Sequence, residues 1–76
     1  MSKRIPALKP GRIIRTLLKA GFVIHHQTGS HIRLKHPEKP ETLTFARHDR
    51  FEVPHIITQK LLRRARLTEE EFLNLL

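Results

Sequence analysis

The 76-residue chain contains no cysteine, a single aspartate and no long run of apolar residues. Without cysteine, neither a disulfide framework nor a zinc site built on thiolates can form, so packing alone must stabilise the fold. No apolar run approaches the roughly 20 residues that a membrane span needs, and the charged start of the chain lacks the apolar stretch of a secretory signal. The sequence therefore predicts one small cytoplasmic domain over residues 1–76, without a membrane partner.

Acidic residues are also few, and the four that precede residue 69 are scattered. A magnesium-dependent nuclease normally needs clustered carboxylates. No His-Glu-x-x-His motif is present, and the neighbouring residues His25 and His26 are expected on opposite faces of a strand. The sequence predicts no catalytic metal, and a core of this size leaves little room for an organic cofactor.

Basic residues, by contrast, are abundant: all fifteen Lys and Arg lie between Lys3 and Arg66. Residues 1–68 carry only four acidic side chains, so their formal charge is +11, against +8 for the whole chain. This imbalance favours an anionic partner, with nucleic acid as the first expectation and an acidic protein as the second. The alternative is a basic surface that merely keeps the protein in solution.

Local patterns divide the chain into six elements. Pro10 can open a helix that Gly21 ends, Pro54 can open a second helix, and Thr68 with Glu71 forms the capping box of a third. Between them lie three strand-like runs, 22–27, 30–36 and 41–46, separated by turns at 28–29 and 37–40. Residues 1–8 are predicted to form a loose arm.

Apolar spacing predicts which side chains face the core. In the helices these are Ile13, Ile14, Leu17, Leu18, Ile57, Leu61, Leu62, Ala65, Phe72, Leu75 and Leu76. In the strands, Ile32, Leu34, Leu43 and Phe45 point inward. The predicted fold class is α+β: a small two-layer α-β-β-β-α domain with helices on one face of a three-stranded antiparallel sheet.

The open face of this sheet would carry His31, Arg33 and Lys35 in a row. Gly29 and Ser30 precede His31 and would set the geometry of the turn, although Ser30 is also able to donate a hydrogen bond to a phosphate. Histidine titrates near neutrality and can give or take a proton in the cell. Arg33 and Lys35 are the first candidates for phosphate contacts, followed by Lys19 and Arg47.

RNA is a polyanion that such a face can cleave without a metal, because its 2′-hydroxyl is an internal nucleophile. One histidine can act as acid or base, and neighbouring cations can stabilise the charge that develops on the phosphate. The same residues also suit a solvated strand face, so residue types alone leave catalysis, RNA binding without catalysis and docking of an acidic protein open.

The chain also resembles a known family, the HicA toxins. The resemblance rests on Gly21-Phe22, on the run from Gly29 to Pro37 that begins Gly-Ser-His, on Arg47-His48 and on the ending Leu67 to Phe72, and it extends from Arg12 to Leu76. The chain departs from the family pattern at Ala46, where a proline is usual, and at Pro54-His55-Ile56.

The resemblance implies an mRNA interferase of a toxin–antitoxin pair, with a fold like that of double-stranded RNA-binding domains. It implies that His31 is the catalytic residue, that single-stranded mRNA is cut without a metal or other cofactor, and that a HicB-like antitoxin silences the toxin. We expect that antitoxin to cover His31 directly.

Overall fold

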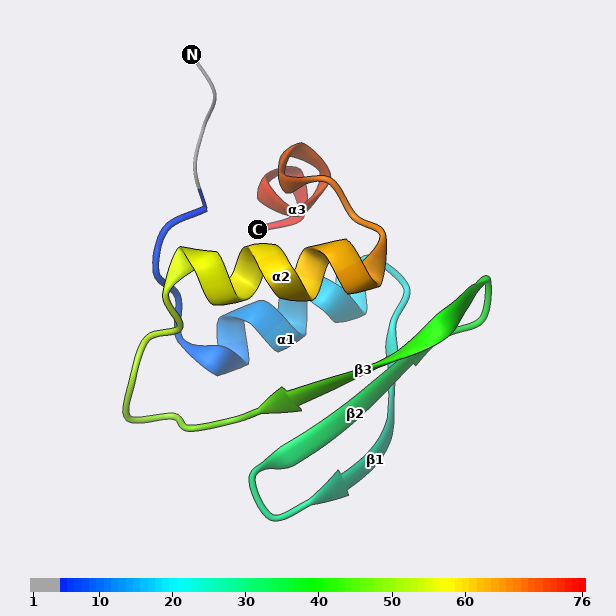
Figure 1. Ribbon diagram of the computed structural model, residues 1–76, viewed down its shortest axis with the longest axis horizontal. Helices are drawn as coiled ribbons and strands as arrows, with labels where there is room; N and C mark the ends of the chain where they lie inside the picture. The colour runs from blue at the N-terminus through cyan, green and yellow to red at the C-terminus, as the bar shows by residue number, and fades with distance from the viewer. Residues whose placement is uncertain (1–4) are drawn as a thin grey trace.

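A computed structural model describes residues 5–76 as three helices and one antiparallel sheet (Figure 1). In chain order the elements are α1 (Pro10–Lys19), β1 (Val23–Thr28), β2 (His31–His36), β3 (Lys39–Ala46), α2 (His55–Ala65) and α3 (Glu69–Leu75). The strands lie in the order β1-β2-β3. The predicted α+β class is therefore confirmed, with strand bounds that differ by one or two residues from those predicted.

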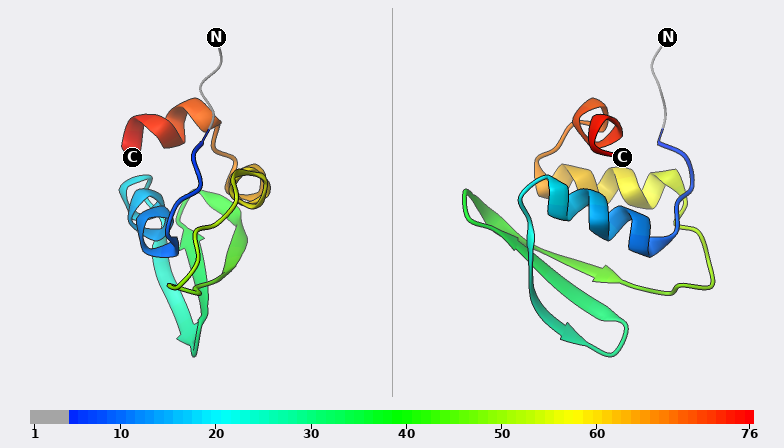
Figure 2. Two further views of the ribbon diagram at one scale, coloured as in Figure 1. Left: turned by 90° about the vertical axis from the view of Figure 1, so that its left-hand side faces the viewer. Right: turned by 180° about the vertical axis from the view of Figure 1, so that it is seen from behind.

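The helices gather on one side of the sheet, and α3 lies farthest from the strands (Figures 1 and 2). The hairpin of β1 and β2 extends away from the helices. As a result, β2 and β3 bury alternate side chains beneath the helices, whereas all six residues of β1 are exposed. No helix within residues 5–76 is long and apolar enough to cross a membrane.

The core confirms the predicted inward positions of β2 and β3, namely Ile32, Leu34, Leu43 and Phe45. It also confirms most of the predicted helical positions: Ile13, Ile14, Leu17, Leu61, Leu62, Ala65 and Phe72 are buried. Leu75 and Leu76 are only half-buried.

Two predicted core residues are instead exposed: Leu18 keeps 40% of its surface accessible and Ile57 keeps 47%. The buried positions of α2 are Thr58, Leu61, Leu62 and Ala65, which follow the i, i+3, i+4, i+7 spacing of one helical face and leave Ile57 beside it. On α1, Thr16 is buried, and its Oγ1 is satisfied there by the 2.8 Å hydrogen bond that it donates to the Arg12 carbonyl.

The prediction of a loose N-terminal arm is wrong for residues 5–8; residues 1–4 lie outside the described part of the chain. Ile5 is buried in the core, and Leu8 pairs with Val53 through two backbone hydrogen bonds of 3.3 and 2.7 Å. This pairing joins segments 45 positions apart in the sequence, so no local sequence pattern predicts it.

The chain reverses at two glycines with positive φ, Gly21 (φ 100°) after α1 and Gly29 (φ 57°) between β1 and β2. The predicted capping box of α3 is confirmed: the Thr68 Oγ1 accepts from the Glu71 N–H, and the Thr68 N–H donates to Glu71 Oε1. The hydrogen bonds from the Thr68 N–H and hydroxyl lower the pKa of Glu71 because they favour its ionised form.

Candidate functional site

A two-residue turn, Gly29-Ser30, places His31 at the first position of β2. The left-handed φ of Gly29, without one at Ser30, is the pattern of a type II′ hairpin turn. A Cβ built on Gly29 would meet no atom within 4 Å. Glycine is therefore favoured here by the backbone angle alone, and the tip of the hairpin is open to an approaching partner.

His31 lies at a shallow hollow of about 340 Å³ on the sheet face away from the helices, which we call the histidine hollow. Its lining residues come from all three strands: His26, Thr28, His31, Arg33 and Thr44. The strand register explains the grouping, because Thr28 is paired with His31 and Arg33 is paired with His26 on one side and Thr44 on the other. All five residues are exposed.

Arg33 and Lys35 follow His31 at alternate positions of β2, and both are exposed. Arg33 lines the histidine hollow, whereas Lys35 is paired with Val23 and lies about 13 Å along the strand from His31. Within residues 5–76 the ion pairs are Arg47–Asp49 and Arg66–Glu41. Neither Arg33 nor Lys35 has an ion-pair partner in the described part of the chain, so both cations remain available to an anionic ligand.

Arg47 supports the hairpin through its backbone rather than its side chain, since its N–H donates a 2.6 Å hydrogen bond to the Ser30 carbonyl. Its Nε donates to Asp49 Oδ1 at 2.9 Å, and its guanidinium lies against Gly11, where an added Cβ would be 3.3 Å away. The Arg47 side chain thus lines a second hollow, near the start of α1.

Lys19 is also separate from the histidine hollow. Its Nζ donates a 3.2 Å hydrogen bond to the Leu75 carbonyl near the end of α3, on the side of the molecule that the helices occupy (Figure 1). Of the predicted site residues, the structure brings together Gly29, Ser30, His31 and Arg33, with Lys35 farther along the same strand.

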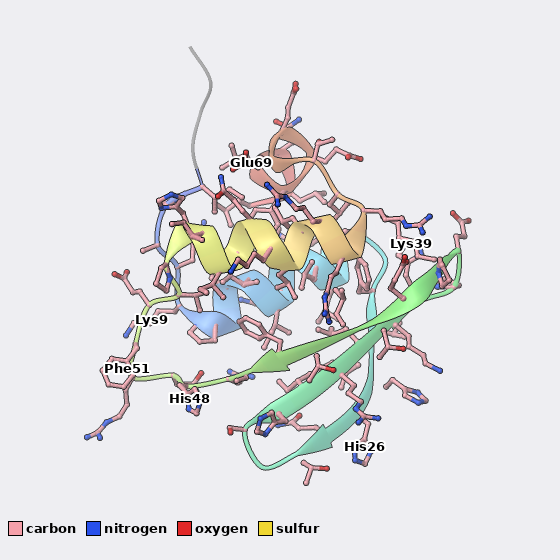
Figure 3. The ribbon with its side chains drawn as sticks, in the orientation of Figure 1. Lys9, His26, Lys39, His48, Phe51 and Glu69 are labelled. Carbon is pink, nitrogen blue, oxygen red and sulfur yellow. The ribbon has the colours of Figure 1, made fainter. Side chains whose placement is uncertain are left out.

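Sequence reasoning missed His26 and Thr28 as parts of this site. His26 Nε2 lies 2.7 Å from Thr28 Oγ1, and Figure 3 shows His26 on the strand farthest from the helices. Counting back by twos from Thr28 places His26 on the face of Thr28. This alternation predicts which face of β1 carries His26. Whether His26 lies beside His31 depends in addition on the register between β1 and β2.

The other histidines differ in their surroundings. His36 Nε2 lies 3.2 Å from the Ala20 carbonyl, and its ring packs edge-on against Phe22 with centroids 5.0 Å apart. His48 is on the loop that follows β3 (Figure 3). Across residues 5–76, no three His, Asp or Glu side chains form a group that could hold a metal ion.

The comparison with family models gives a match over most of the chain. The model described as "HicA toxin of bacterial toxin-antitoxin" matches residues 11–67, which include α1 except its first residue, the whole sheet and α2. The comparison with curated proteins gives no match. Because the matched residues include the Gly29-Ser30-His31 turn and make up well over half of the 76 residues, the chain belongs to the HicA family of toxins of bacterial toxin–antitoxin systems.

Proposed function

We propose that this toxin is a metal-independent endoribonuclease that cleaves single-stranded mRNA in the cytoplasm. The observation that carries the proposal is the histidine hollow, in which an exposed histidine and an arginine without an ion-pair partner among residues 5–76 share an open sheet face. A titratable group beside a free cation is the minimum that phosphodiester cleavage by the RNA's own 2′-hydroxyl requires.

In the proposed reaction, the 2′-oxygen attacks the adjacent phosphorus and loses its proton to a base. The bond from phosphorus to the 5′-oxygen then breaks, and an acid protonates the leaving oxygen. His31 acts as one of these proton-transfer groups. The products are a 2′,3′-cyclic phosphate and a 5′-hydroxyl, so no water or metal enters this step.

Arg33 is assigned to the scissile phosphate, because its guanidinium can donate two hydrogen bonds to phosphate oxygens. Lys35, farther along β2, is assigned to a neighbouring phosphate of the same strand. Gly29 and Ser30 position His31 through the turn. Lys19 and Arg47 contact RNA only if the strand extends beyond the histidine hollow, since their side chains lie elsewhere.

Incubation of the purified protein with labelled single-stranded RNA in excess EDTA tests the proposal. We expect the RNA to be cut and an all-deoxy strand of the same sequence to stay intact, because DNA lacks the 2′-hydroxyl. A requirement for magnesium would contradict the mechanism. Binding of RNA without cleavage would instead identify the protein as a non-catalytic RNA-binding module.

We further propose that a HicB-like antitoxin covers His31. The chain has a formal charge of +8, and the cations of β2 have no acidic partner among residues 5–76. An acidic protein would therefore meet the open sheet face with complementary potential, which speeds association. A partner seated there would block RNA sterically.

Modification by diethylpyrocarbonate tests where the antitoxin sits. We expect His31 to react in the free toxin and to be protected in the complex, whereas His55, at the start of α2, reacts in both. Mass spectrometry of the digested protein reads out each histidine. Equal modification of His31 in the two states would refute occlusion and favour inhibition from a remote surface, such as the acidic first turn of α3.

A further inference from the structure

We propose that His26 is the second proton-transfer group of the reaction, acting on the opposite side of the scissile phosphate from His31. This inference rests on the proposed ribonuclease function and adds a catalytic residue to it. His26 lines the same hollow as His31 but comes from the neighbouring strand, β1.

The strand register sets the spacing of the two histidines. Thr28 is paired with His31, and His26 is paired with Arg33. His26 and His31 are therefore diagonal neighbours across the β1–β2 pair, for which Cβ atoms lie about 7–8 Å apart or somewhat less. Each imidazole extends several bonds beyond its Cβ, and we assign the scissile phosphate to the space between the two rings, with Arg33 beside it.

Thr28 supplies a partner that suits a group which gains and loses a proton. Its Oγ1 lies 2.7 Å from His26 Nε2, and the hydroxyl oxygen can accept a hydrogen bond from an Nε2–H, which the ring carries whether Nδ1 is bare or protonated. The contact therefore holds the ring in both protonation states. Among residues 5–76, no hydrogen bond occupies His26 Nδ1, which leaves that atom to exchange a proton with RNA.

The proton balance requires two groups in opposite states. One histidine starts neutral and takes the 2′-hydroxyl proton as the O2′–P bond forms. The other starts protonated and gives its proton to the 5′-oxygen as the P–O5′ bond breaks. At the end of the step the two histidines have exchanged states, and solvent restores them.

The side chains that line the histidine hollow together with His26 come from all three strands. On β1 the neighbour is the uncharged Thr28; on β2 the neighbours are the charged Arg33 and the titratable His31; and on β3 Thr44 carries no charge. Arg33 is thus the one fixed charge at the histidine hollow, where it is paired with His26 and lies two residues from His31 along β2.

His25 provides a matched control. It neighbours His26 in sequence and is equally exposed, but it sits at the irregularity between Ile24 and His26, has no partner on β2 and does not line the histidine hollow. A change of histidine to glutamine at either position removes the titratable group and keeps a polar side chain of similar size.

The test compares kcat/KM for a labelled RNA across pH 5–9 in excess EDTA for the unmodified protein, His25→Gln and His26→Gln. Two proton-transfer groups give a bell-shaped profile. We expect a bell-shaped pH profile for the unmodified protein and for His25→Gln, with values of kcat/KM within about threefold of each other. For His26→Gln we expect kcat/KM to fall by roughly 100- to 10,000-fold. The pH profile should also lose either its acidic or its basic limb.

The outcomes separate this inference from the proposed function. If His26→Gln cleaves RNA as His25→Gln does, or is slower but keeps both limbs, His26 is not a proton-transfer group although the ribonuclease function stands. If the unmodified protein does not cleave RNA, both proposals fail. Far-UV circular dichroism and the melting temperature of each variant confirm that the fold is retained.

Discussion

Replacement of His31 by alanine is expected to lower the rate of RNA cleavage by roughly 100- to 10,000-fold. The loss follows because the imidazole is a proton-transfer group of the proposed reaction and no neighbouring strand residue can occupy its place at the turn. Stability should change by no more than about 0.5 kcal/mol, because the side chain is exposed at the start of β2. Single-turnover cleavage and urea unfolding measure the two effects separately.

A second substitution separates the loss of the titratable group from the loss of side-chain size in His31→Ala. His31→Gln keeps a polar side chain of similar size but cannot exchange a proton near neutrality, so it should be as inactive as His31→Ala. Cleavage by either variant at a rate within about threefold of the unmodified protein would remove His31 from the chemistry. Loss of activity together with a lower melting temperature would point to a structural role instead.

Replacement of Leu17 by alanine is expected to cost roughly 2–5 kcal/mol of the free energy of unfolding, because it removes a fully buried side chain and leaves a cavity. A domain of this length has about 4–11 kcal/mol in total. The variant should therefore be partly unfolded under mild conditions.

Leu18→Ala is the matched control, since Leu18 is the next residue of the same helix and keeps 40% of its surface exposed. We expect it to cost less than about 1 kcal/mol. Urea unfolding followed by circular dichroism gives both values. Equal unfolding midpoints for the two variants would contradict the placement of Leu17 in the core.

The parts of the fold that the sequence predicts well are those that short-range periodicity determines. Ile32 and Leu34 are buried and His31 and Arg33 exposed because side chains of a strand alternate between faces. The capping box is likewise local, because Thr68 and Glu71 are only three positions apart. A β2 strand with a histidine and two cations on its open face followed from these patterns alone.

The parts that the sequence does not predict depend on segments far apart in the chain. Ile5 enters the core because Leu8 pairs with Val53. Arg47 turns toward the start of α1, and Lys19 toward the end of α3. Periodicity within one element has no information on these contacts, so it could not separate the cations near His31 from those elsewhere.

The position of His26 beside His31 also depends on a contact between two separate segments of the chain. Whether a β1 residue lies beside His31 depends on the register between two strands, and a shift by one residue moves every side chain to the other face. The irregularity between Ile24 and His26 lies beyond His26 as seen from the turn, so the pairs from Thr28 to His26 are continuous. The two-residue turn at Gly29-Ser30 fixes the register by pairing Thr28 with His31.

In the proposed reaction the 2′-hydroxyl of RNA is the nucleophile, and the protein supplies the proton transfers. The most direct test uses a DNA strand with a single ribonucleotide, placed where the protein cuts the corresponding all-RNA strand, in excess EDTA. We predict one cut, directly 3′ of that ribonucleotide, with a 2′,3′-cyclic phosphate on one fragment and a 5′-hydroxyl on the other. Cleavage at deoxynucleotides, or a 5′-phosphate at the cut, would show that the 2′-hydroxyl is not the nucleophile.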